Sequence, residues 1–313
     1  MRLWSSALIA LAVSAPISAA AQSSSGPLTP WGAPDLQGIW DFRSLTPMER
    51  PGNLAGKEQF TTQEAAEFAQ QTIRRQSRDL VTSGRVVPYN DFWFDEGTKV
   101  TTQRTSLIVD PPDGKMPALT PEAEKKRAAQ REARRGVGAD IPRPGAWVED
   151  ISASVRCIVG FNSGPPMRPS AYNNNMQLFQ TREHVVILNE MVHDARIIPL
   201  DSRSHLSQPV SQWMGDSRGH WEGRTLVVET TNFREERTPF GSSAAVRLVE
   251  RFTRVAADTL NYEVTVNDPA TWTKPWTFRV PMAKTSELMY EYACHEGNYG
   301  LYGILAAAGT SQK

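Results

Sequence analysis

Residues 185–196 (VVILNEMVHDAR) hold the densest group of side chains that could do chemistry. The run opens as an apolar strand and continues with an amide, two carboxylates, an imidazole and a guanidinium, on Asn189, Glu190, Asp194, His193 and Arg196. Strands rich in valine and isoleucine are usually half-buried, so ionisable groups within one need partners or a function. Histidine beside carboxylates is what proton transfer or a metal site requires. The run therefore predicts a functional pocket without naming a substrate.

Strand geometry divides these groups between two faces. On a regular strand Asn189 and His193 share one face, while Glu190, Asp194 and Arg196 share the other, unless a bulge intervenes. One interpretation is structural, with a Glu190–Arg196 ion pair and a hydrogen-bonded His193. The functional interpretation makes His193 a general acid or base and Glu190 a second catalytic candidate, with further partners drawn from other strands.

A second candidate site, residues 290–298 (YEYACHEGN), leads from an expected strand into a glycine-containing turn. Strand ends at the mouth of a barrel are places where side chains reach a ligand. His295 or Glu296 would complement His193 in proton transfer, and Tyr292 would contact the substrate. The structural alternative is a disulfide-anchored loop in which His295 caps the local backbone.

Further candidates for substrate binding are Tyr172, Asn174, Arg196 and Trp93. The first two belong to a Tyr-Asn-Asn-Asn run whose phenol and amides can hydrogen-bond sugar hydroxyls or phenolic oxygens, although such a run is also typical of turns. Arg196 or Tyr172 would stabilise developing negative charge. Trp93 lies in an aromatic and acidic cluster over residues 89–95.

Other motifs argue against several enzyme classes. Residues 216–220 (DSRGH) combine Asp, Ser and His but favour a hairpin turn. The chain has no Gly-x-Ser-x-Gly elbow, phosphate loop or dinucleotide fingerprint, so serine hydrolysis and nicotinamide redox chemistry have no support. We expect no cofactor and no metal; the alternative is a two-His, one-carboxylate site built from His193, His295 and Glu190 or Glu296.

The first 21 residues predict a secretory signal peptide, with a positive start, a short apolar run and an Ala-Ala-Ala cleavage site before Gln22. The apolar run is too short to span a bilayer. We therefore expect a periplasmic or extracellular protein with no membrane span. A disordered leader (22–34) precedes one β-barrel domain (35–313), with a helical and loop insertion at about 44–147.

Composition gives no sign of a nucleic-acid partner. The 34 basic and 34 acidic residues balance, so no global field attracts nucleic acid or anionic lipid. The expected partner is a small-molecule ligand or substrate. Cys157 and Cys294 are the two cysteines, and an oxidising compartment favours a disulfide between them over free thiols. That bond would bring His295 and Glu296 beside the loop at Cys157.

The elements expected around these sites are two helices and many short strands. Thr61 and Glu64 form a capping box for a helix ending before Ser83, and residues 121–135 form a charged, solvated helix. Eleven strands are expected, at 35–41, 104–110, 176–180, 185–191, 196–200, 212–216, 226–231, 247–255, 259–266, 276–282 and 289–293. Both faces of 247–255 mix charged and apolar residues, which favours a barrel with an internal cavity over a packed sandwich. Trp272, Trp276, Phe278, Tyr290 and Tyr292 would form its apolar walls.

The start at residues 35–40 (DLQGIW) resembles the Gly-x-Trp opening of lipocalin-like (calycin) barrels. Together with 189–196, 213–230, 247–255, 268–276 and 290–298, it also resembles a large family of exported bacterial proteins. The resemblance implies an exported, mainly β, antiparallel lipocalin-like barrel and transfers no catalytic residue. Proteins with lipocalin-like barrels include both binders and cofactor-free enzymes, so the fold does not choose between these functions.

Three hypotheses follow from this sequence. The first is an exported cofactor-free lyase, hydratase or isomerase that uses His–carboxylate acid–base chemistry on a small aromatic, terpenoid or glycosidic compound. The second is a non-catalytic carrier of a small hydrophobic ligand, in which the histidines lie outside the cavity. The third is an interaction domain of the envelope, which needs no enclosed pocket.

Overall fold

The computed structural model describes residues 26–79, 90–133, 147–207 and 209–310. The expected signal peptide and the first leader residues lie outside these ranges. Residues 26–34 form an ordered turn and not the expected disordered leader, because Thr29 hydrogen-bonds Ala33 and the Asp35 amide donates to Pro27 at 2.9 Å. No described helix is long and apolar enough to cross a bilayer.

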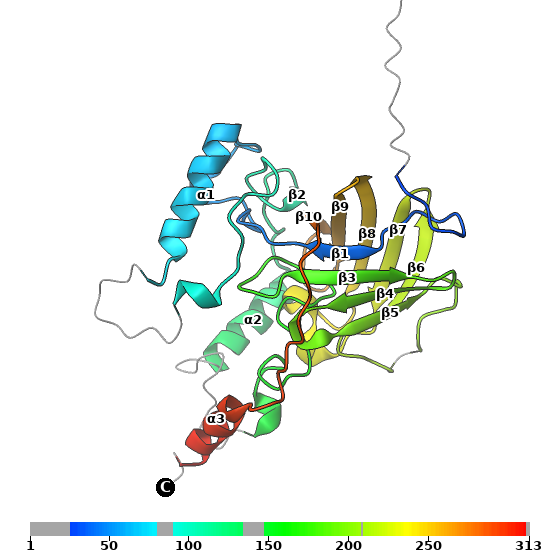
Figure 1. Ribbon diagram of the computed structural model, residues 1–313. Coiled ribbons are helices and arrows are strands. Elements are labelled where there is room, and N and C mark those ends of the chain that lie inside the picture. The colour runs from blue at the N-terminus through cyan, green and yellow to red at the C-terminus, as the bar shows by residue number, and fades with distance from the viewer. Residues whose placement is uncertain (1–25, 80–89, 134–146, 208, 311–313) are drawn as a thin grey trace, which may run out of the picture.

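The architecture is mainly β, as predicted, and every strand pairs antiparallel (Figure 1). The order across the sheet is β5-β4-β3-β1-β10-β9-β8-β7-β6, with β2 also paired to β10. The strands are β1 (Gly38–Asp41), β2 (Ile108–Asp110), β3 (Asn175–Gln180), β4 (His184–Asn189), β5 (Ala195–Pro199), β6 (Asp216–Glu222), β7 (Thr225–Thr231), β8 (Arg247–Ala256), β9 (Thr259–Asn267) and β10 (Trp276–Thr285).

The sheet curls until its two edges meet, but its ladder does not close. Strands β5 and β6 lie in contact without pairing. Gly219 of β6 permits this approach, since a Cβ there would lie 2.8 Å from the Leu200 side chain and 3.0 Å from that of Ile198. The expected closed barrel is therefore corrected to an open, strongly curved antiparallel sheet.

The interior of this sheet is filled where we expected a cavity. Alternate residues of β9 are buried along its whole length, as period-two geometry requires. The largest fully buried side chains include Trp40, Trp276, Tyr262, Phe252 and Phe278. Burying each such ring contributes roughly 1.5–3 kcal/mol. Three of the expected cavity walls, Trp272, Trp276 and Phe278, are thus core residues, whereas Tyr290 and Tyr292 lie outside this core.

The run 185–196 is a hairpin rather than one strand. β4 ends at Asn189, a 3-10 turn covers Met191–His193, and β5 begins at Ala195. Val192 and His193 take left-handed φ values of 61° and 43°. The turn resets the alternation, so Asn189 and Arg196 are both buried and do not lie on opposite faces as expected.

Three other local expectations are corrected. Residues 216–220 belong to β6 and are not a turn, and 212–216 do not form a strand. Residues 289–293 have no strand partner among the described residues. A third helix, α3 (Tyr299–Thr310), was not expected, although Asn298 directly precedes it and caps it by accepting from the Leu301 amide at 3.2 Å.

The two expected helices are confirmed as α1 (Thr62–Gln76) and α2 (Pro121–Ala133). The capping box of α1 is present: Thr61 Oγ1 accepts from the Glu64 amide at 3.2 Å, and Glu64 Oε2 accepts from the Thr61 amide at 2.8 Å. Figure 1 shows α1 standing to one side of the sheet, with irregular chain between them.

Candidate functional site

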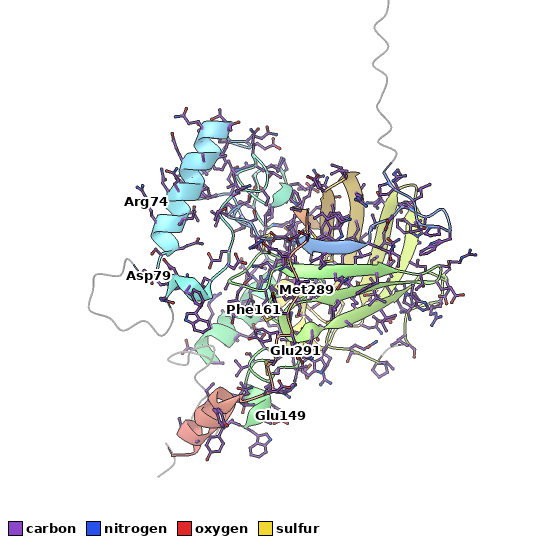
Figure 2. All side chains as sticks on the ribbon, in the orientation of Figure 1. Arg74, Asp79, Glu149, Phe161, Met289 and Glu291 are labelled. Atoms are coloured by element: carbon purple, nitrogen blue, oxygen red, sulfur yellow. A yellow bond between two sulfur atoms is a disulfide. The ribbon has the colours of Figure 1, made fainter. Side chains whose placement is uncertain are left out.

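The disulfide between Cys157 and Cys294 is present and ties the C-terminal segment to the loop before β3. That segment, which carries Met289 and Glu291 in Figure 2, runs along the outside of the sheet. Asn298 strengthens the connection by donating to the Val155 carbonyl at 3.0 Å. The predicted proximity of the two regions is therefore confirmed.

The imidazole of His193 contacts the backbone of the C-terminal segment. Its Nδ1 lies 3.3 Å from the carbonyl oxygen of Tyr292, and its imidazole is exposed. His295 and Glu296 are exposed too, and within the described residues neither side chain hydrogen-bonds His193. Within the described residues the side chains of His193, His295 and Glu296 therefore do not form the expected catalytic group. His193 instead contacts the Tyr292 carbonyl.

The remaining residues of the predicted site do not converge on one pocket. Glu190 is buried and accepts a hydrogen bond from Asn175 Nδ2 at 2.9 Å. Asn174 is buried as well, and its amide joins Ser170 to the Asp95 carbonyl. These bonds hold the loop in place, which gives Asn174 a structural role.

Aromatic contacts do bring some predicted residues together. The rings of Tyr172 and Tyr292 stack at 6.5 Å, and Tyr172 also packs edge-on against Phe161 at 5.3 Å. Trp93 has 59% of its surface exposed, and its ring packs edge-on against Phe92. Tyr172 and Tyr292 form one wall beside His193.

Arg196 is part of the core and not of a surface site. Its guanidinium donates to both oxygens of Glu250, at 2.6 and 3.0 Å, and Tyr262 donates its hydroxyl to Glu250 at 2.7 Å. Burial disfavours the charge on Arg196, but the Glu250 carboxylate outweighs this and raises the arginine pKa. The mixed charged and apolar faces that suggested a wet cavity are explained by this buried ion pair.

A polar cluster that the sequence did not reveal surrounds Asp194. Its Oδ2 accepts from Ser163 Oγ at 3.1 Å and from the Gly160 amide at 3.3 Å. Arg237 donates to the Gly160 carbonyl at 3.1 Å. Burial raises the pKa of the half-buried Asp194 carboxyl above its ordinary value. This carboxyl, next in sequence to His193, therefore favours its protonated form more than an exposed aspartate does.

A histidine that lies between two carboxylates, His205, was not predicted from the sequence as a site residue. His205 Nδ1 lies 3.0 Å from Asp216, and its Nε2 lies 3.5 Å from Glu229. Asp216 is further held by Arg218 at 2.5 Å. Among the described residues no three His, Cys, Asp or Glu side chains are placed to hold a metal ion. The sequence did not predict this cluster, because His205 precedes β6 in a loop and has no regular spacing relative to Asp216 and Glu229.

An open cleft of about 510 Å³ lies between α1, residues 44–51 and residues 168–171, and we call it the α1 cleft. Its walls are partly apolar, with Phe68 and Leu107 among them. Thr46 and Thr72 also line it, each only 4% exposed. Neither threonine hydroxyl has a hydrogen-bond partner within the described chain. Buried polar atoms are normally paired, so the two unpaired hydroxyls beside this cleft are candidate contacts for a ligand or a water.

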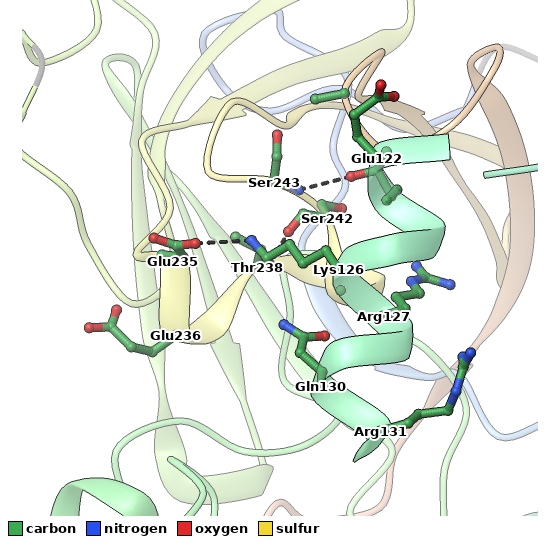
Figure 3. Close-up of a pocket in the computed structure, with 14 residues that line it drawn as sticks. Glu122, Lys126, Arg127, Gln130, Arg131, Glu235, Glu236, Thr238, Ser242 and Ser243 are labelled. Atoms are coloured by element: carbon green, nitrogen blue, oxygen red, sulfur yellow. Dashed lines mark hydrogen bonds and ion pairs between the residues drawn. The ribbon is translucent and has the colours of Figure 1, made fainter. Parts of the chain in front are cut away.

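A second cleft, of about 830 Å³, lies between α2 and residues 235–243 (Figure 3). Several of its charged groups already bond to protein: Lys126 pairs with Glu235 at 3.0 Å, and Arg127 donates to the Phe240 carbonyl at 3.0 Å. The Ser243 hydroxyl donates to Asp268 at 2.9 Å. Because these groups are already paired, they are less available to bind a ligand than the unpaired groups of the α1 cleft.

Comparison with known proteins identifies no relative. No protein-family model matches the chain, and no curated protein matches it in sequence. One solved structure with some similarity is a secretory abundant heat soluble protein from Ramazzottius varieornatus. It is 11% identical, with a TM-score of 0.24, and the match covers 36% of this chain and 70% of that one. A similarity this low carries no conclusion about fold or function.

Proposed function

We propose that this protein is an exported, non-catalytic carrier whose small, partly apolar ligand occupies the α1 cleft. The observation that carries the proposal is the pair of buried, unpartnered hydroxyls of Thr46 and Thr72. An unpaired buried hydroxyl costs roughly 1–3 kcal/mol, which a ligand that hydrogen-bonds it recovers. The cleft volume also lies within the range of small-molecule sites, about 300–1,000 Å³.

The fold supports a carrier with an unusual site. The Gly-x-Trp start, the consecutive antiparallel ladder and the contacting edge strands favour a lipocalin-like barrel left open between β5 and β6. The interior is filled by aromatic rings and by the Arg196–Glu250 pair, so we place the ligand outside the sheet.

A thermal-shift panel of neutral and charged, aliphatic and aromatic compounds tests the proposal. A ligand at 100 times its dissociation constant stabilises the folded state by about 2.7 kcal/mol. For a domain of this size that raises the melting temperature by roughly 5–10 °C. The Thr46→Val/Thr72→Val variant should melt higher than wild type without ligand and lose most of the ligand-induced shift.

Thr105→Val is the matched control. Thr105 is also fully buried, but its hydroxyl is bonded to Lys57 and Arg50, at 2.6 and 2.9 Å. This variant should melt lower than wild type and keep the ligand-induced shift. If no compound shifts the wild type, or if the double valine variant keeps the full shift, the carrier proposal is wrong.

A second candidate is the cofactor-free lyase, hydratase or isomerase, favoured by Asp194. Its raised pKa, the neighbouring exposed His193 and the nearby Tyr172–Tyr292 wall are groups suited to proton transfer. In this proposal His193 moves the proton and Asp194 takes the place expected for His295 or Glu296. Incubation of compounds from the panel with wild type and with His193→Ala distinguishes the two functions. Turnover that His193→Ala abolishes, with the fold retained, supports the enzyme; unchanged compounds support the carrier.

A further inference from the structure

Arg168 lines the α1 cleft and carries a positive charge that the protein leaves unpaired. No carboxylate of the described residues lies within ion-pair distance of its guanidinium. The group is accessible, yet the protein around it removes enough water to lower its pKa. Its Cζ lies 5.6 Å from the ring of Phe240, a cation–π distance that orients the side chain. The Arg168 guanidinium is therefore a partly dehydrated cation whose position is restrained by the Phe240 ring.

A second arginine adds to this positive charge. Arg237 lies close enough that the charge of Arg168 lowers its pKa, after the larger effect of burial. Asp194 acts on it in the opposite direction but forms no ion pair with it within 4 Å in the described chain. Among the described residues, two arginines and one carboxyl whose own pKa is raised leave a local excess of positive charge.

The other charged groups of the cleft do not offset that excess. Arg75 lines the wall formed by α1 and forms no ion pair among the described residues. Glu96 is the acidic residue in the lining, and it is paired with Arg78 at 3.5 Å. Within the part of the chain that the structure describes, the cleft thus combines unpaired cations, two unpaired hydroxyls and apolar walls.

We infer that the ligand of the α1 cleft is a small amphipathic anion, with its carboxylate, sulfate or phosphate group on Arg168 and its apolar body against Phe68 and Leu107. The inference rests on the proposed carrier function and adds the chemical class of the ligand. A guanidinium binds such groups through two parallel N–H donors. Thr46 and Thr72 donate to further oxygen atoms of the ligand, and Arg237 acts as a positioning residue through its effect on Arg168.

Titration calorimetry with paired probes tests the inference. The probes are linear and phenyl-substituted carboxylates of roughly four to twelve carbons and their primary amides, sizes that a cleft of this volume can bury. We expect the best carboxylate to bind at least about tenfold more tightly than its amide, which corresponds to about 1.4 kcal/mol. Arg168→Gln should remove this preference while leaving amide affinity within about threefold, and Arg168→Lys should keep part of it.

Arg182→Gln is the matched control, because Arg182 is an exposed arginine in the turn between β3 and β4. It should bind both probe classes as wild type does, and circular dichroism checks that each variant is folded. Amides that bind as tightly as carboxylates, with no effect of Arg168→Gln, would overturn the anionic ligand but leave the carrier standing. If no probe of either class binds the wild type, both proposals fail. A preference for carboxylates that persists in Arg168→Gln places the anion elsewhere and also overturns the inference.

Discussion

Replacing Glu250 with glutamine removes the negative charge that compensates Arg196 in the core. The Glu250 side chain is fully buried and accepts two hydrogen bonds from Arg196, one from Tyr262 and a longer one, at 3.4 Å, from Thr230 Oγ1. Glutamine has one acceptor oxygen, and its amide group presents hydrogens to a guanidinium that has only donors. Arg196 then remains charged, buried and poorly paired.

Removing one partner of a buried ion pair costs about 3–5 kcal/mol. We expect Glu250→Gln to lose this much in free energy of unfolding, and roughly 6–20 °C in melting temperature for a domain of this size. Arg196→Met/Glu250→Leu should lose less, since no buried charge remains and the Tyr262 hydroxyl still accepts from the Met167 amide at 3.1 Å.

Urea denaturation of the disulfide-bonded protein at neutral pH measures both variants. The two single substitutions and the double form a cycle that isolates the coupling between the partners. A Glu250→Gln variant within about 1 kcal/mol of wild type, or a double variant less stable than Glu250→Gln, would refute this reading of the core.

Two further predictions concern the disulfide and the Asp194 carboxyl. Replacing Cys157 and Cys294 by serine opens a loop with a sequence separation of 137 and should lower the free energy of unfolding by roughly 4–5 kcal/mol; a loss below about 1 kcal/mol in urea denaturation would show that the bond constrains little. Burial raises the pKa of Asp194 in the folded protein above its unfolded value, so its carboxylate opposes folding at neutral pH and this opposition fades as the pH falls through the folded pKa. Wild type should therefore gain stability relative to Asp194→Asn between about pH 7 and pH 4, and a difference that does not change with pH would contradict the burial effect.

Local patterns predicted much of the fold. The Thr61–Glu64 capping box and Pro121 mark helix starts that the structure confirms, because capping depends on residues a few positions apart. The alternation in residues 247–256 correctly groups Leu248, Glu250 and Phe252 on one face. The cysteine pair was likewise predictable from the expected oxidising compartment.

Long-range packing explains what could not be predicted. The alternation in β8 shows that Glu250 faces inward. Only the fold places Arg196, 54 residues away in the sequence, opposite it. The side chains of this core fill the interior where a cavity was predicted. The hairpin at Met191–His193 depends on left-handed residues that sequence does not mark, since neither Val192 nor His193 is glycine or asparagine. Thr46 and Thr72 carried no signal, because an unpaired hydroxyl is recognised only when all its neighbours are known.

Methyl NMR of the protein with its tightest-binding probe locates the ligand most directly. The carrier proposal predicts that shift changes concentrate on methyl groups of the α1 cleft, namely those of Thr46, Thr72, Leu45, Met48 and Leu107. Interior methyl groups, such as those of Leu178 and Val264, should stay unchanged. Changes that concentrate on the interior, or beside His193 on Met191 and Val192, would contradict the α1 cleft as the binding site.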